Sequence, residues 1–243
     1  MSSIPTLRHL MNLVESAGVA ARDPRSNSRF RAWFGDSKVV DAEGKPLVLF
    51  HGTAADIQSF KGTVWASVTP ALANEYAAMR DHYGKGGGNV MPVFMRIERP
   101  FNADLGLSKT VKIGEFFGAV MEQAVESGVA VSPALRDEAT ELLGLVRDCA
   151  RREESGPHYD RHNFWLDPAS SFGSDGAQAI RRLFSLFGFD GVQMIEGGEL
   201  TFGAFSSEQV KSVFNSNFEP TSTRVSEAGF VGARQGDRRT FFP

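Results

Sequence analysis

A histidine and a glycine close the most apolar run of this chain, and their position makes them candidates for chemistry. The run LVLFHGT predicts a buried strand that ends on His51 and Gly52. A second short run, TVWAS, predicts another strand and carries Trp65. Tyr76 follows on a predicted helix. Four residues of these types are therefore expected at the ends of neighbouring elements.

These residue types suit the cleavage of a bond between a sugar and a positively charged aromatic ring. Histidine hydrogen-bonds hydroxyl groups without a permanent charge, and glycine lets backbone groups approach a ligand closely. The faces of Trp65 and Tyr76 can stack on a cationic ring. A carboxylate completes the set, because such a bond breaks through an oxocarbenium-like transition state. The nicotinamide–ribose bond of NAD is of this kind.

Each residue also has a purely structural interpretation. A histidine at the end of a strand is often structural, and Tyr76 shares its predicted helix face with Leu72 and Ala73, as a core residue does. The candidate carboxylate, Glu199, stands beside a Gly-Gly turn, where glutamates usually face solvent. The pattern as a whole favours the pocket interpretation.

The order of the predicted elements favours an α+β fold. Strands are expected on both sides of a helical block, with mostly antiparallel pairing and helices packed against the sheet. Prolines, glycines and capping residues mark the ends of the elements. The prediction comprises a hairpin from 38 to 51, helix 70–80, strand 91–100, two helices within 108–152, helix 174–187, hairpin 189–205 and helix 208–214.

Composition excludes several classes of function. A net charge of −3 over 243 residues gives no general footprint for nucleic acid and no bias toward a membrane surface. No run approaches the roughly 18 apolar residues of a membrane span, and the N-terminal stretch does not resemble a secretory signal. One cysteine, Cys149, fits a reducing cytoplasm. No Cys/His cluster has metal-ligand spacing, so no metal is expected.

The stretch FRAWFGDSKVVDAEGKPLVLFHGT, continued by GTVWASVTPALANEYA, is similar to the opening of ADP-ribosyltransferase-like domains in phage and mobile-element polyvalent proteins. MPVFMRIERPF resembles the third strand of that family, and GFDGVQMIEGGELTFGAFSSEQVKS resembles its closing hairpin and helix. The order is that of the histidine–tyrosine–glutamate branch. The resemblance implies split antiparallel sheets with an NAD cleft, plus an N-terminal helix and an inserted helical pair.

The resemblance also implies a set of NAD-binding residues. They are His51, Gly52, Thr53, Trp65, Ser67, Tyr76 and Thr201. Within this set, His51 and Tyr76 are also the expected catalytic residues. Ala73 stands where some members have an amide-binding serine, so that contact is not expected here.

The closing hairpin departs from the family pattern. Thr201 falls where the catalytic glutamate of the family stands, and Glu199 precedes it by two residues. Positions two apart share one face of a strand, so Glu199 is the expected catalytic carboxylate, displaced by about 6–7 Å along the strand. A bulge at the Gly197-Gly198 turn or at Gly203 could correct that displacement.

The resemblance implies an NAD-dependent mono-ADP-ribosyltransferase of phage or prophage origin that works in the host cytoplasm. A host protein is the expected acceptor of ADP-ribose, with a nucleic acid as the second candidate; association with the virion is a further expectation, and no membrane partner is expected. Three alternatives stay open. They are an NAD glycohydrolase, a non-catalytic NAD- or partner-binding module of the same fold, and an interaction adaptor dominated by the two ends.

Three segments are expected along the chain. An N-terminal helix and linker occupy residues 1–26. The transferase-like domain covers 27–219 and contains the helical insertion at 108–155. A polar, locally basic and flexible tail is expected over 220–243.

Overall fold

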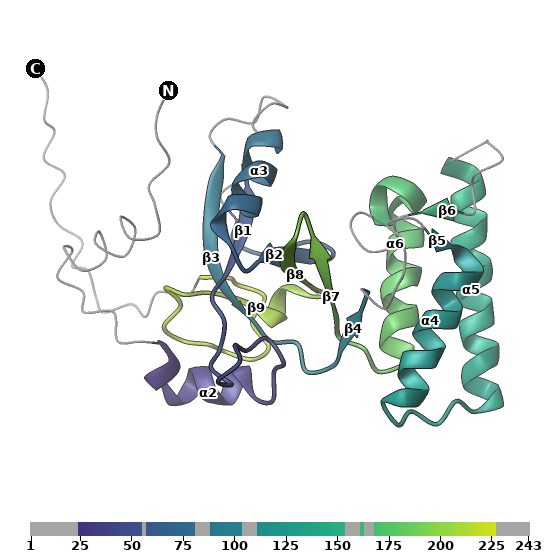
Figure 1. Cartoon of the computed structure of the whole chain (residues 1–243), viewed down its shortest axis with the longest axis horizontal. Helices are drawn as coiled ribbons and strands as arrows, with labels where there is room; N and C mark the ends of the chain where they lie inside the picture. The colour runs from purple at the N-terminus through teal and green to yellow at the C-terminus, as the bar shows by residue number, and fades with distance from the viewer. Residues whose placement is uncertain are drawn as a thin grey trace, which may run out of the picture.

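The computed structural model of the chain describes residues 24–54, 57–80, 88–103, 111–153, 161–162 and 168–226. An open β-sheet lies beside a block of three helices (Figure 1). The predicted α+β class is therefore confirmed. The predicted N-terminal helix falls outside the described residues. None of the helices in the described part of the chain is both long and apolar enough to cross a membrane.

Along the sequence, the helical block lies between strands that belong to one sheet. The elements are η1 (Pro24–Ser26), α2 (Ser28–Phe34), β1 (Leu49–Thr53), β2 (Val64–Ser67), α3 (Pro70–Arg80), β3 (Asn89–Met95), β4 (Pro100–Asn102), β5 (Val111–Lys112), α4 (Ile113–Glu126), α5 (Pro133–Glu153), β6 (Arg161–His162), α6 (Pro168–Leu186), β7 (Gly191–Glu196), β8 (Glu199–Ala204), η3 (Ser207–Gln209) and β9 (Val210–Ser212).

Seven strands form one hydrogen-bonded sheet in the order β4-β7-β8-β2-β1-β3-β9, and β5 pairs with β6 separately. All pairs in the large sheet are antiparallel except β4 with β7. The predicted split into two sheets corresponds to a weak junction in one sheet, where β1 and β2 pair at a single position, Phe50 with Ser67. One sheet with a weak junction therefore replaces the two separate sheets that were expected.

The two faces of the β7–β8–β2 half-sheet bury different cores. Phe202 and Ala66 belong to a core that includes Leu49 of β1. Met194 points to the other face and joins the core of the helical block. The helical block thus packs directly on the sheet, and alternation along each strand decides which side chains meet it.

The helical block is larger than the predicted pair. α4 and α5 lie within the predicted insertion, and α6 packs along α5. α6 begins at Pro168 instead of Ser174, the residue from which the sequence predicted it. The buried residues of all three helices form one core, so α6 belongs to the block although it was predicted as a separate helix.

Two other predicted elements are wrong. Of the hairpin expected from 38 to 51, the second strand is present as β1, but the first is reduced to one isolated bridge, Val40 with Pro46. The helix expected over 208–214 is a single turn, η3, followed by strand β9. The side chain of Gln209 accepts hydrogen bonds from the backbone of Phe205 and Ser206 and so stabilises that turn. Residues 210–212 then pair with β3, because tertiary pairing outweighs a local capping signal.

The domain extends beyond the predicted boundary at residue 219. Val225 is fully buried, and its backbone exchanges hydrogen bonds with Gln58 and Ser212. The fully buried Lys211 donates from Nζ to the carbonyls of Ser222 and Arg224. Residues 220–226 are thus part of the packed domain and not of a flexible tail; residues 227–243 lie outside the described residues.

Candidate functional site

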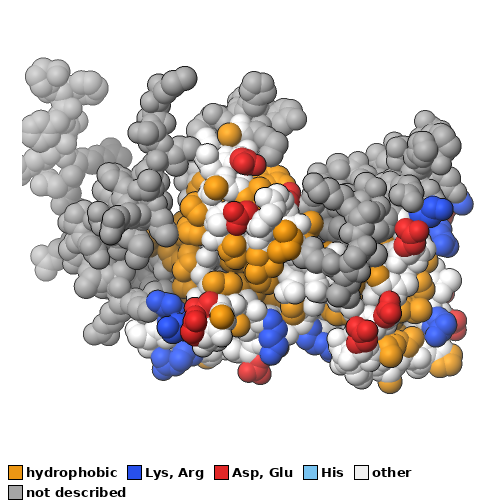
Figure 2. Space-filling view, in the orientation of Figure 1, with side chains coloured by type: hydrophobic (Ala, Val, Ile, Leu, Met, Phe, Trp, Pro, Cys, Tyr) orange, Lys and Arg blue, Asp and Glu red, His pale blue; other side chains and the backbone are white. Residues whose placement is uncertain are grey.

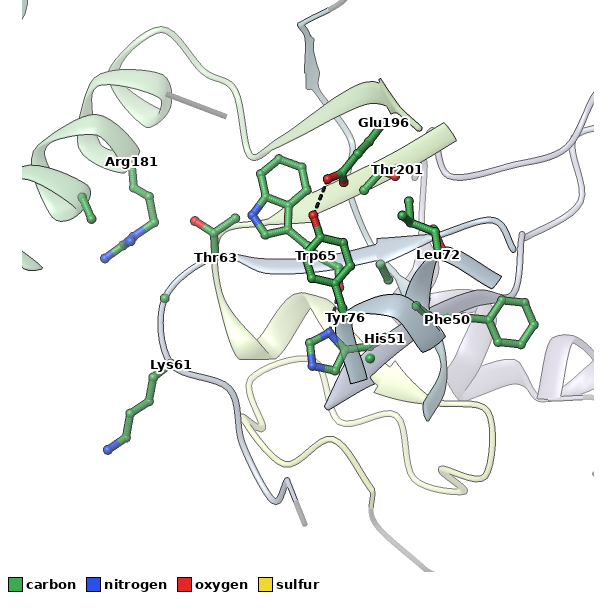
Figure 3. A pocket seen from close by; sticks show the side chains of 16 residues that line it. Phe50, His51, Lys61, Thr63, Trp65, Leu72, Tyr76, Arg181, Glu196 and Thr201 are labelled. Carbon is green, nitrogen blue, oxygen red and sulfur yellow. Dashed lines mark hydrogen bonds between the residues drawn. The ribbon is translucent and has the colours of Figure 1, made fainter. Parts of the chain in front are cut away.

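A cavity of about 320 Å³ opens where the β1–β2 ladder breaks off. Its size suits a small-molecule site. Residues of β1, β2, α3, α6 and the β7–β8 hairpin line it (Figure 3). Most of the predicted site residues meet here: His51, Gly52, Trp65, Ser67, Tyr76 and Thr201. Figure 2 shows hydrophobic side chains gathered over this part of the molecule, between α3 and the β7–β8 hairpin.

The pairing of β3 determines where the backbone groups of Gly52 point. The carbonyl of Pro92 accepts the N–H of Val213 on the β9 side, so Pro92 and its β1 partner Phe50 exchange no hydrogen bonds. Bonded and non-bonded pairs alternate along an antiparallel ladder. Gly52, two residues after Phe50, therefore also turns its N–H and C=O away from β3 and toward β2.

His51 stands where the β1–β2 ladder would continue. Beyond the Phe50–Ser67 pair, Trp65 would be the next partner of Gly52. Instead, Nδ1 of His51 lies 2.7 Å from the carbonyl oxygen of Trp65. A carbonyl can only accept, so Nδ1 carries a hydrogen and donates it. The imidazole thus separates the strands and leaves Gly52 without a strand partner on the cavity side.

Packing of α3 also requires a glycine at position 52. A Cβ on Gly52 would lie 1.9 Å from the carbonyl oxygen of Ala73, which is impossible without moving the helix. Access for a ligand was the reason expected from the sequence for this glycine. Contact between β1 and α3 is a second reason, and it holds whether or not a ligand binds.

Tyr76 and Glu196 are joined by a hydrogen bond. The Tyr76 hydroxyl donates to Oε1 of Glu196 (Figure 3). Burial, followed by the hydrogen bond to Glu196, raises the pKa of the Tyr76 phenol well above its ordinary value. The phenol therefore stays protonated at neutral pH and holds one oxygen of the Glu196 carboxylate in place.

Glu199, the predicted catalytic carboxylate, is not among the residues that line the cavity. It pairs with Glu196 across a tight turn made by Gly197 (φ 59°) and Gly198 (φ 87°). The pairs between β7 and β8 follow one another without a gap, so the bulge that could have repositioned Glu199 is absent. Among the described residues, the carboxylate that lines the cavity is that of Glu196.

The two threonines among the predicted residues differ in position. Thr201 is buried, lines the cavity and pairs with Ser67 on the neighbouring strand. Thr53 is buried as well but does not belong to the cavity wall. Thr201 thus lines the cavity at the position where the sequence resemblance places the catalytic glutamate.

Comparison with known proteins agrees with the sequence resemblance. A family model described as ADP-ribosyltransferase in polyvalent proteins matches residues 41–220. The chain belongs to this family. The matched region contains every cavity residue named above. No curated protein and no solved structure matches the chain.

Gly203, considered from the sequence only as a possible bulge, makes room for the indole of Trp65. A Cβ on Gly203 would lie 2.8 Å from a ring atom of Trp65, so only a glycine lets the indole lie this close to β8. The indole nitrogen of Trp65 is buried and has no hydrogen-bond partner among the described residues. The cavity wall thus contains one buried N–H donor, that of Trp65, for which the described residues supply no acceptor.

Four polar lining residues were missed from the sequence: Lys61, Thr63, Arg181 and Glu196. Alternation along β7 could have indicated Glu196, which is two residues after Met194 and shares its face. No local pattern could have indicated Arg181, because it reaches the cavity from α6. Within the described residues, no group of three His, Cys, Asp or Glu side chains is arranged to hold a metal ion.

Proposed function

We propose that this ADP-ribosyltransferase-family protein is a mono-ADP-ribosyltransferase that uses NAD. The observation that carries the proposal is the backbone of Gly52, which faces the cavity and has no strand partner on that side among the described residues. A primary carboxamide has one carbonyl acceptor and an NH₂ donor group. The nicotinamide of NAD can therefore pair with Gly52 much as a neighbouring strand residue would.

The surrounding side chains suit the chemistry of NAD cleavage. The ring of Tyr76 offers a stacking face for the pyridinium, and His51 offers hydrogen bonds to ribose hydroxyls. The carboxylate of Glu196 favours the positive charge that develops on the ribose. In this role Glu196, from β7, takes the place of the glutamate that the family has at the Thr201 position.

The proposed reaction transfers the ADP-ribosyl group from nicotinamide to an acceptor. The bond between ribose C1′ and the pyridinium nitrogen breaks, and its electron pair leaves with neutral nicotinamide. A nucleophile of the acceptor supplies the pair for the new bond to C1′ and releases a proton. We propose a host protein in the cytoplasm as acceptor, because the resemblance is to domains carried by phages and mobile elements. A nucleic acid is the alternative acceptor, and association with the virion is part of the same proposal.

Nicotinamide release by matched glutamate variants tests the proposed site. The wild-type protein should release nicotinamide from NAD and should transfer labelled ADP-ribose to a component of host lysate. Glu196→Gln keeps the shape of the side chain and removes its charge, so release should fall by about 100-fold. Glu199→Gln should leave the rate essentially unchanged. Equal activity in both variants would remove Glu196 from the mechanism.

A second candidate function is a non-catalytic module that binds NAD. The observation that favours it is Thr201, which lines the cavity where the family has its glutamate. Calorimetry with NAD, run beside the release assay, separates the two functions, since this candidate predicts binding without release. Release without transfer of label would instead identify an NAD glycohydrolase.

A further inference from the structure

One wall of the cavity comes from the helical block and carries a cation. Ala177 and Arg181, one turn apart on α6, both line the cavity. Arg181 also approaches the chain just before β2: its Nη1 lies 3.7 Å from where a Cβ of Gly62 would stand. In Figure 3 the guanidinium of Arg181 lies on the opposite side of Trp65 from Glu196. The cavity thus has a carboxylate at one end and a cation at the other.

The guanidinium of Arg181 has no hydrogen bond or ion pair with any side chain in the described ranges. By contrast, the next residue, Arg182, forms an ion pair of 3.1 Å with Glu138 on α5. Arg181 is half-buried, and burial lowers the pKa of its guanidinium. A partly buried cation with no counter-charge among the described residues costs free energy, and an anion that binds there would remove that cost.

Two further donors lie at this end of the cavity. Lys61 lines the cavity and is exposed, and the buried indole N–H of Trp65 has no partner among the described residues. Arg181 borders a second cavity that contains Asp175 and Asp190, but it forms an ion pair with neither. Asp190 accepts instead from two backbone N–H groups. Donors and positive charge therefore dominate this end.

We propose that Arg181, assisted by Lys61 at the rim, binds the diphosphate of NAD, so that the helical block supplies part of the NAD site. This inference rests on the proposed function. NAD carries its positive charge on the nicotinamide ring and its negative charge on the diphosphate, and the cavity places the opposite charges in matching order. A guanidinium can bind phosphate oxygens through two parallel hydrogen bonds.

Binding of ADP-ribose tests the inference, because this molecule keeps the diphosphate and lacks nicotinamide. By calorimetry at low salt, Arg181→Ala should weaken ADP-ribose binding by about 10- to 100-fold, as expected for lost hydrogen bonds to a charged group. Arg182→Ala is the matched control on the same helix and should bind like wild type. Arg181→Lys should recover part of the affinity, since it restores the charge without the fork of donors.

Two further measurements separate binding from folding and from catalysis. Lys61 is exposed, so Lys61→Ala cannot disturb the core and should weaken ADP-ribose binding several-fold. Nicotinamide binding should be the same in wild type and Arg181→Ala, because nicotinamide is expected at the other end. Wild type that fails to bind ADP-ribose, or an Arg181→Ala variant that binds it equally well, would overturn the inference. Loss of nicotinamide release alone would count only against the proposed transferase function.

Discussion

Tyr76 has two separable roles at the residue scale, a flat ring and a hydroxyl that holds Glu196. Tyr76→Phe keeps the ring and removes the donor. We expect nicotinamide to bind the variant about as well as wild type, while nicotinamide release falls by about tenfold, the effect of one hydrogen bond to a charged group. Tyr76→Ala should lose both properties. A normal release rate in Tyr76→Phe would show that the contact with Glu196 has no part in catalysis.

The raised pKa of the Tyr76 phenol predicts its behaviour in alkali. Free tyrosine ionises near pH 10, but Tyr76 should stay protonated there, because burial and Glu196 both oppose a phenolate. Since folding raises this pKa, the stabilisation is complete below about pH 10 and declines as the pH rises further toward the folded-state pKa. The ultraviolet difference titration between wild type and Tyr76→Phe isolates this phenol. Ionisation at its ordinary pH would contradict the geometry.

The spacing of residues in the sequence predicted several residues on β1 and β2 that line the cavity, but not the charged residues that do so. His51, Gly52 and Trp65 follow one another within two adjacent strands, so their placement needed only the strand assignments. Glu196 and Glu199 flank the same turn, and only the register and the cavity wall distinguish them. Arg181 was not predictable, since its place depends on how α6 packs against the sheet.

At the scale of elements, the contact between β1 and α3 depends on Gly52. Gly52→Ala should lower the free energy of unfolding by about 3 kcal/mol, because the added methyl group overlaps the α3 backbone. Gly144→Ala in α5 is the control: its added Cβ has nothing within 4 Å and should stabilise the helix by up to about 1 kcal/mol. Urea denaturation measures both. Equal stability of the two variants would exclude close packing at Gly52.

Elements whose ends are marked by a proline or by glycines were predicted well. α3 begins at the proline expected, although the hydroxyl of Thr69 has no hydrogen-bond partner among the described residues and so does not cap it there. The β7–β8 hairpin follows from its two glycines, both at positive φ. β9 was missed because its pairing partner, β3, is distant in sequence, and no local pattern reports a partner.

At the scale of the whole molecule, the segment 220–226 should be part of the folding unit. A chain that ends at Glu219 loses the buried Val225 and the two carbonyls that accept from Lys211. We expect its free energy of unfolding to fall by about 4 kcal/mol. A chain that ends at Ser226 should keep the stability that the shorter one loses. Thermal unfolding of both truncated proteins provides the measurement, and identical curves would show that the segment contributes nothing.

The fold class was predictable because strands on both sides of a helical block exclude a simple parallel α/β arrangement. The continuity of the sheet was not. One residue pair between β1 and β2 decides whether there are two sheets or one, and the two strands diverge beyond that pair, between Gly52 and Trp65. The same divergence creates the cavity, so the least predictable part of the topology is also the part that carries the site.

The junction at Phe50 and Ser67 gives this sheet an internal edge. Unpaired main-chain groups usually stand on an outer strand, where they can recruit another polypeptide and lead to aggregation. Here those of Gly52 lie at a buried position, beside His51 and against α3. The proposed function uses this internal edge, since a partner as small as a single amide group would pair there without the recruitment of another strand.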